Sequence, residues 1–140
     1  MSSSRLLITY LTRRSDIRQP SRVVENIPKT SRYTVVAAAN GDEALKLART
    51  NNFDLYVIDN WMSGVSGIDL CRKLREFDSR TPILFYSGAA FERDKQDAFA
   101  AGAQGYLVKP AGPDELIAEV NRIVSAARSQ SGRVASAMAQ

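Results

Sequence analysis

The chain has 140 residues, of which 44% are apolar and 24% charged, as expected for one globular domain with a core of its own. It contains no histidine and one cysteine, which excludes the commonest general base, most zinc sites and an intramolecular disulfide. No apolar run is long enough to cross a bilayer and no signal peptide is recognisable, so we expect a cytoplasmic protein.

The net charge of +4 is distributed unevenly. Residues 1–32 carry seven Lys or Arg and two acids, residues 33–121 carry nine and thirteen, and residues 122–140 carry three Arg and no acid. The body is therefore mildly acidic and both ends are basic. Because the body lacks a basic face with interleaved aromatic residues, we do not expect it to bind nucleic acid directly.

In the first half of the chain, apolar runs alternate with helical patterns. Leu6–Tyr10 reads as a buried strand, a weak helix is expected around residues 20–27, and Tyr33–Ala38 reads as a β-branched second strand. A helix is predicted from Asp42 to about Arg49, since two leading acids suit a helix N-terminus. Leu55–Asp59 is the third predicted strand.

The alternation continues in the second half. The spacing of Ile68, Cys71, Leu74 and Phe77 predicts a third helix, and we interpret Cys71 as a small core residue. The remaining predicted elements are a strand over Pro82–Ser87, a helix over Asp94–Ala101 ended by Gly102, and a strand over Gly105–Val108.

A fifth helix is predicted to begin at Pro113. Its apolar face consists of Leu116, Ile117, Val120, Ile123 and Val124. Residues 126–140 are small, polar and basic, and we interpret them as a frayed tail or a truncated linker, which leaves residues 1–125 for the domain.

Five strand–helix units with short connections predict an α/β fold, a doubly wound five-stranded parallel sheet with helices on both faces. Sites in such sheets lie beyond the carboxyl ends of the strands. Asp59, Ser87 and Lys109 each stand at a strand end, so we expect them to meet at one edge. Asp59 also follows the apolar run Leu55–Ile58, where a carboxylate costs desolvation energy and needs a partner or a function.

These three side chains suit chemistry on a phosphoryl group. The Asp59 carboxylate can be the nucleophile, the Ser87 hydroxyl can donate to a phosphoryl oxygen, and the Lys109 ammonium supplies a compact positive charge. Each residue is weak evidence alone, whereas the three together at successive strand ends are much stronger.

Several motifs resemble the receiver domain of two-component response regulators. The matching segments are Asn40–Leu45, Asp54–Asp59 followed by Met62–Gly67, Thr81–Ile83 with Ser87–Gly88, and Ala101–Ala103 with Gly105–Pro110. The resemblance is good over residues 33–124 and poor over residues 1–32. It implies a flavodoxin-like three-layer sandwich with strand order 2-1-3-4-5.

The resemblance also implies residue roles. Asp59 would accept a phosphoryl group from a phosphohistidine of a histidine kinase or phosphotransfer protein. Ser87 would then move toward the phosphoryl oxygen and Tyr106 would turn inward as the aromatic switch. Lys109 would pair with Asp59 or its phosphate, and the Lys109–Pro110 peptide bond would be cis.

Magnesium is the cofactor that the resemblance implies, bound by Asp59 and by the main-chain carbonyl of Trp61. Receivers also end their first strand with two acids that bind this metal, whereas here the strand is followed by Leu11–Arg14 and the nearest acid is Asp16. Either Asp16 serves as a lone ligand, or magnesium binding is weak or lost, or an arginine of this segment (Arg13 or Arg14) replaces the metal charge. We favour weak or absent binding.

The leading functional interpretation is a phosphoacceptor domain in signalling, with a homodimer through the fourth and fifth helices as a family expectation. The alternative is a pseudo-receiver, an interaction module that works without phosphorylation. An aspartate-nucleophile phosphatase is disfavoured, because such enzymes usually carry a second carboxylate where Trp61 stands.

Overall fold

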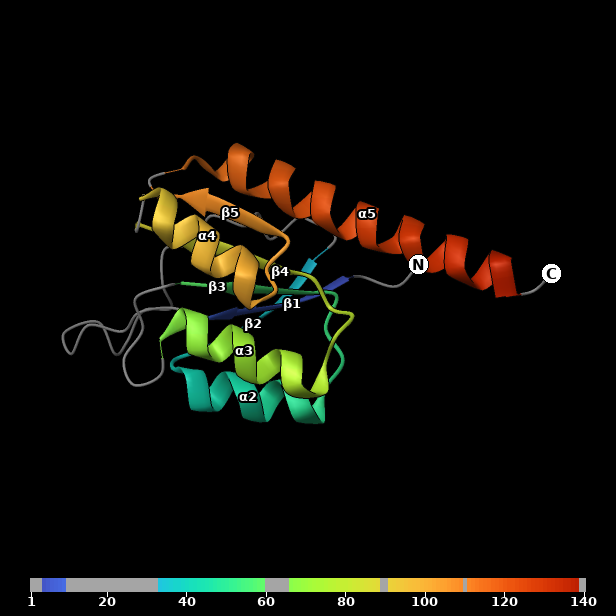
Figure 1. The fold of residues 1–140 in the computed structure, drawn as a ribbon, viewed down its shortest axis with the longest axis horizontal. Helices are drawn as coiled ribbons and strands as arrows, with labels where there is room; N and C mark the ends of the chain where they lie inside the picture. The colour runs from blue at the N-terminus through green and yellow to red at the C-terminus, as the bar shows by residue number, and fades with distance from the viewer. Residues whose placement is uncertain (1–3, 10–32, 60–65, 89–90, 110, 139–140) are drawn as a thin grey trace.

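A computed structural model describes residues 4–9, 33–59, 66–88, 91–109 and 111–138. Five strands and four helices alternate along the described chain (Figure 1). The strands are β1 (Ser4–Thr9), β2 (Tyr33–Ala38), β3 (Leu55–Ile58), β4 (Ile83–Ser87) and β5 (Gly105–Val108). The helices are α2 (Gly41–Thr50), α3 (Gly67–Phe77), α4 (Glu92–Ala101) and α5 (Pro113–Met138).

The strands form one parallel sheet in the order β2-β1-β3-β4-β5. β1 lies between β2 and β3, with Leu6 opposite both Val35 and Leu55. All carboxyl ends of the strands therefore lie at one edge of the sheet. The predicted fold class and strand order are confirmed.

Two apolar layers hold the helices against the sheet (Figure 1). Tyr56, Ile58 and Phe85 belong to the layer under α2, α3 and α4, whereas Val57 and Leu84 belong to the layer under α5. Strand residues alternate between the two layers because successive side chains of a strand point to opposite faces. The result is a three-layer sandwich.

Local chemistry sets the helix ends. The Asn40 side chain accepts a hydrogen bond from the backbone N–H of Glu43 (2.8 Å) and so caps α2. α4 ends at Gly102, whose φ of 117° lies in the left-handed region that favours glycine. The predicted C-terminal glycine is therefore confirmed. Cys71 is fully buried in the core, as predicted.

The boundaries of several elements differ from the sequence-based prediction; β1, for example, begins at Ser4 rather than at Leu6. β4 begins at Ile83, because Pro82 has no N–H to give to the sheet, although its carbonyl accepts from Tyr56 N (3.0 Å). α4 begins two residues before Asp94, whose carboxylate accepts from the N–H of Phe91 (3.2 Å).

The largest difference concerns the C-terminal segment. α5 continues to Met138, so the described backbone is helical past residue 126, where a frayed tail or a truncated linker was expected. Propensity explains this, because alanine, arginine and serine continue a helix once Pro113 and the acids after it have started it. None of the described helices is both long and apolar enough to span a membrane. The helix expected around residues 20–27 lies outside the described residues.

Candidate functional site

Three neighbouring strands bring the predicted site residues to the carboxyl edge of the sheet. Asp59 follows β3 directly, Ser87 is the last residue of β4, and Lys109 follows β5. The backbone N–H of Lys109 donates to the Ser87 carbonyl (2.9 Å), which extends the pairing of β4 and β5 by one residue. Residues far apart in the sequence thus share one edge because the strands are parallel and adjacent.

An ion pair lies at the centre of this edge. The Lys109 ammonium is 2.8 Å from Oδ2 of Asp59, and Asp59 is only 6% exposed. A carboxylate withdrawn from water to this degree requires a partner, because desolvation penalises its charged form. Lys109 remains about one third exposed, so its charge can be approached from solvent.

Tyr86 also contacts Lys109, and sequence reasoning did not single it out. The Lys109 ammonium lies 5.1 Å from the centre of the Tyr86 ring, within the range of a cation–π contact. The Tyr86 hydroxyl in turn donates to the carbonyl of Ala111 (3.1 Å). The sign of this contact in the sequence is that an aromatic residue stands immediately before Ser87. The topology places this residue beside β5, the strand that leads to Lys109.

Ser87 and Tyr106 lie on the same face of the sheet. Tyr106 stands opposite Phe85 in the register and stacks on its ring, with 5.7 Å between the ring centres and 4° between the planes. Ser87 is two residues after Phe85 on the same strand, so its side chain projects to that face as well. Ser87 is fully buried, whereas Tyr106 is half-buried.

Three predicted site residues lie outside the described residues: Asp16, Trp61 and Pro110. Arg13 and Arg14, considered as replacements for the metal charge, also lie outside them. Within the described part of the chain, no three His, Cys, Asp or Glu side chains gather as a metal cluster. Asp59 offers the carboxylate oxygens that Mg²⁺ prefers, and the other ligands and the cis peptide stay predictions.

The ion pair at the strand ends, the buried hydroxyl and the stacked tyrosine can be compared with known proteins. The model of the response regulator receiver domain family matches residues 16–121. The transcriptional regulatory protein ResD of Bacillus subtilis is 36% identical over 92 residues, which are 66% of this chain and 38% of ResD. The chain therefore spans less than half the length of this relative.

Solved structures agree with the sequence match. The receiver domain of the Francisella response regulator 1452 superposes with a TM-score of 0.75 at 30% identity, over 87% of this chain and 97% of that one. The receiver domain of sensor histidine kinase PA1611 from Pseudomonas aeruginosa, solved with a magnesium ion in its active site cleft, gives a TM-score of 0.75 at 23% identity, over 88% and 98%. The chain belongs to the response regulator receiver domain family of two-component signalling.

Proposed function

We propose that this receiver domain accepts a phosphoryl group on Asp59 from a phosphohistidine of a histidine kinase or a phosphotransfer protein. The observation that supports this proposal best is the Asp59–Lys109 ion pair, a buried carboxylate at a strand end with an ammonium 2.8 Å away. We place the domain in the cytoplasm with such a kinase, and we assign it the role of phosphoacceptor rather than of enzyme.

In this proposal the Asp59 carboxylate is the nucleophile. One of its oxygens forms a bond to phosphorus while the bond from phosphorus to the imidazole nitrogen of the donor breaks, and that nitrogen keeps the electron pair. Lys109 offsets the negative charge of the phosphoryl oxygens. Ser87 then donates to one of these oxygens, and Tyr106 changes its packing on Phe85 as the switch.

We further propose that Mg²⁺ binds more weakly than in receivers with two acids after the first strand. The metal would supply charge that reduces repulsion between carboxylate and phosphoryl group. Titration with Mg²⁺ while the fluorescence of Trp61, the single tryptophan, is recorded tests this. We expect no saturation at low millimolar metal, and saturable quenching in that range would contradict the proposal.

The phosphorylation site is tested by replacement of Asp59. Incubation with radiolabelled acetyl phosphate or with a phosphorylated kinase should label the wild type, and the label should be lost in Asp59→Ala. Asp69→Ala is the matched control, because Asp69 is an exposed acid on α3 that pairs with Arg72 rather than with Lys109. Labelling that persists in Asp59→Ala would disprove the assignment.

We also propose that α4 and α5 form the face through which the domain contacts a second copy or another partner. Two large apolar side chains of this region are exposed, Phe91 at 80% and Phe99 at 49%. Direct contact with nucleic acid would then belong to a partner or to another domain. Sedimentation before and after phosphorylation tests this face, and an unchanged mass would count against a homodimer.

A further inference from the structure

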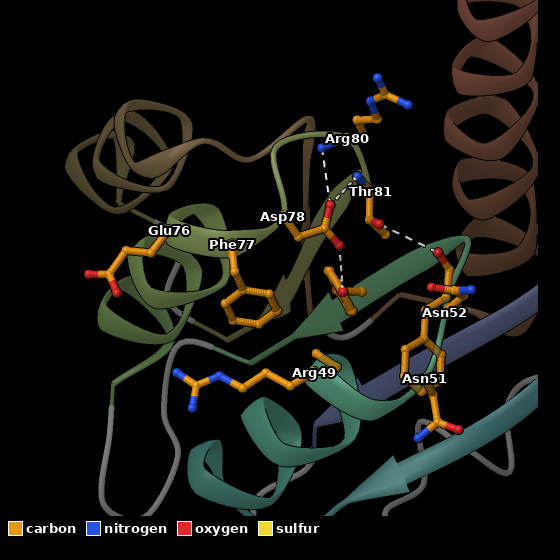
Figure 2. Close-up of a pocket in the computed structure, with 11 residues that line it drawn as sticks. Arg49, Asn51, Asn52, Glu76, Phe77, Asp78, Arg80 and Thr81 are labelled. Atoms are coloured by element: carbon orange, nitrogen blue, oxygen red, sulfur yellow. Dashed lines mark hydrogen bonds between the residues drawn. The ribbon is translucent and has the colours of Figure 1, made fainter.

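A second candidate site lies at the opposite edge of the sheet from Asp59. A cavity of about 770 Å³ opens between the end of α2, the end of α3 and the segment that leads into β4 (Figure 2). Its volume is within the range of ligand pockets, roughly 300–1,000 Å³. Tyr56 lines it near the start of β3, and Asp59 follows the other end of that strand.

One exposed aromatic ring stands in the cavity wall. Phe77 is 41% exposed although it is a large apolar residue, whereas Phe53 and Tyr56, which also line the cavity, are 7% and 2% exposed. Exposed aromatic surface beside a concavity favours a ligand with a flat apolar part, because stacking removes both surfaces from water.

Asp78, in the wall of the cavity, is already satisfied by the protein. Its Oδ2 accepts from the Tyr56 hydroxyl (2.7 Å), and its Oδ1 accepts from the backbone N–H groups of Arg80 (3.1 Å) and Thr81 (3.0 Å). The dashed lines in Figure 2 show these bonds converging on one carboxylate. Asp78 therefore has little capacity left to attract a cation into the cavity.

Two arginines stand in the cavity wall without an acidic partner among the described residues. Arg49 on α2 and Arg80 before β4 form no ion pair with any described residue. The guanidinium of Arg49 is instead held 5.2 Å over the ring of Phe77. Glu76 is the remaining acid of the wall, and Figure 2 shows its carboxylate directed outward, away from Arg80. An anion is the charge that this arrangement favours.

The cavity also has room for a ligand longer than one ring. A second hollow of about 280 Å³ shares Phe53, Arg80 and Thr81 with it and continues toward α5. Asn51 and Asn52 line the α2 side of the larger hollow. The Asn52 amide can donate to or accept from the polar edge of a ring, whereas Nδ2 of Asn51 already donates to the carbonyl of Leu47 (3.2 Å).

We propose that this cavity binds a small planar aromatic anion, a ring system that carries a carboxylate or a phosphate. The ring lies against Phe77, and the anionic group pairs with Arg49 or Arg80. The site is independent of phosphoryl transfer at Asp59, since the two lie at opposite edges of the sheet.

Amide NMR shifts of the full chain test the proposal with four probes. The aromatic anions 2-naphthoate and adenosine monophosphate should cause saturable shifts at Asn51, Asn52 and Thr81. Adenosine lacks the anionic group and inorganic phosphate lacks the ring, so each should bind at least tenfold more weakly. If only the nucleotide binds, the anionic group recognised is phosphate, and if only 2-naphthoate binds, it is carboxylate.

Variants then distinguish binding at this site from nonspecific binding. Arg80→Ala and Phe77→Ala should each weaken binding about tenfold, the loss of one charge-assisted or stacking contact. Arg93→Ala, at an exposed arginine of α4, is the matched control and should bind as the wild type does. Asp59→Ala should leave the affinity unchanged, which distinguishes this site from the phosphoacceptor.

Three results would overturn the proposal. The first is that neither anion causes saturable shifts at 10 mM (a roughly −2.7 kcal/mol limit on binding). The second is that the nucleotide binds but adenosine binds with the same affinity. The third is an affinity that Arg80→Ala and Phe77→Ala leave unchanged.

Discussion

Asp78 shows how one side chain can hold a loop in place. Burial alone would raise the pKa of its carboxyl group, but hydrogen bonds from Thr81, Tyr56 and Arg80 outweigh burial and lower the pKa below the ordinary value. Burial and the bond to the ionised Asp78 likewise raise the pKa of Tyr56. Both directions describe a neutral phenol that donates to an ionised carboxylate.

This carboxylate makes stability depend on acid. Because the folded pKa is lowered, Asp78 stabilises the fold above its unfolded pKa of about 3.9, and the contribution disappears as pH falls through the folded value. Asp78→Asn should lower the free energy of unfolding at pH 7 by about 1–3 kcal/mol. Urea unfolding from pH 7 to pH 3 should show a flatter acid slope for this variant. Asp69→Asn, at an exposed acid, should retain the wild-type slope.

Two features of Gly102, its backbone conformation and a close neighbour, exclude a side chain at this position. Its φ is 117°, and a Cβ added there would lie 2.9 Å from Nε of Arg75. We expect Gly102→Ala to lower the free energy of unfolding by roughly 1–3 kcal/mol, since it combines backbone strain with overpacking. Gly112→Ala is the control variant in thermal unfolding, because a Cβ at Gly112 meets no atom within 4 Å. Equal melting temperatures for the two variants would contradict this explanation.

Between elements, Arg75 joins the end of α3 to two other connections. Its guanidinium donates to the carbonyls of Asp78 (3.0 Å), Thr81 (2.7 Å) and Gly102 (2.8 Å), and to the Gln104 side chain (2.8 Å). These acceptors are neutral oxygens, and the Gln104 oxygen also accepts from the backbone N–H of Ile83 (2.7 Å). One residue thus fixes the segments before β4 and before β5 relative to α3.

Lysine cannot replace this arginine, because an ammonium lacks the planar set of five donors. Arg75→Lys should therefore cost about 1.5–3 kcal/mol of folding stability, the loss of at least two carbonyl hydrogen bonds. Arg72→Lys on the same helix, at a side chain that is 63% exposed, should cost less than about 0.5 kcal/mol. Chemical denaturation of both variants measures the difference, and similar losses would show that Arg75 does not act through its fork of donors.

At this scale the sequence predicted the strands well and the connections poorly. Apolar runs such as Leu55–Ile58 indicate a buried strand, because the run is short and rich in β-branched and aromatic residues. The roles of Arg75 and Tyr86 depend instead on which carbonyls or cations the fold places beside them. A charged residue on a helix and an aromatic residue in a strand carry no sign of such partners in the sequence.

For the whole molecule, the parallel sheet decides where chemistry is possible. The expectation that Asp59, Ser87 and Lys109 share an edge followed from topology, because parallel strands align their carboxyl ends. The length of α5 did not follow in the same way. Apolar helical periodicity weakens after Val124, the last α5 residue in the described core, and the helix beyond it follows from helix propensity, a weaker signal in the sequence.

The last turns of α5 should contribute little to folding. Among the α5 side chains that the structure describes (residues 114–129), Val124 is the last one in the core, well before the helix ends at Met138. A chain that ends at residue 129 should therefore unfold within about 0.5 kcal/mol of the full chain while it loses helical circular dichroism. Urea titration of both forms tests this, and a larger loss of stability would mean that the final segment packs against the body.

α5 also has a geometric consequence. Its 26 residues span about 39 Å at 1.5 Å per residue, and its first turns follow closely on Lys109 and the end of β5. Figure 1 shows the far end extending past the sheet. A tilt of about 5° at the base would displace the far end by about 3 Å over that length. A small change of angle at the base of α5 would therefore be magnified at Met138, because the displacement grows with distance along the helix.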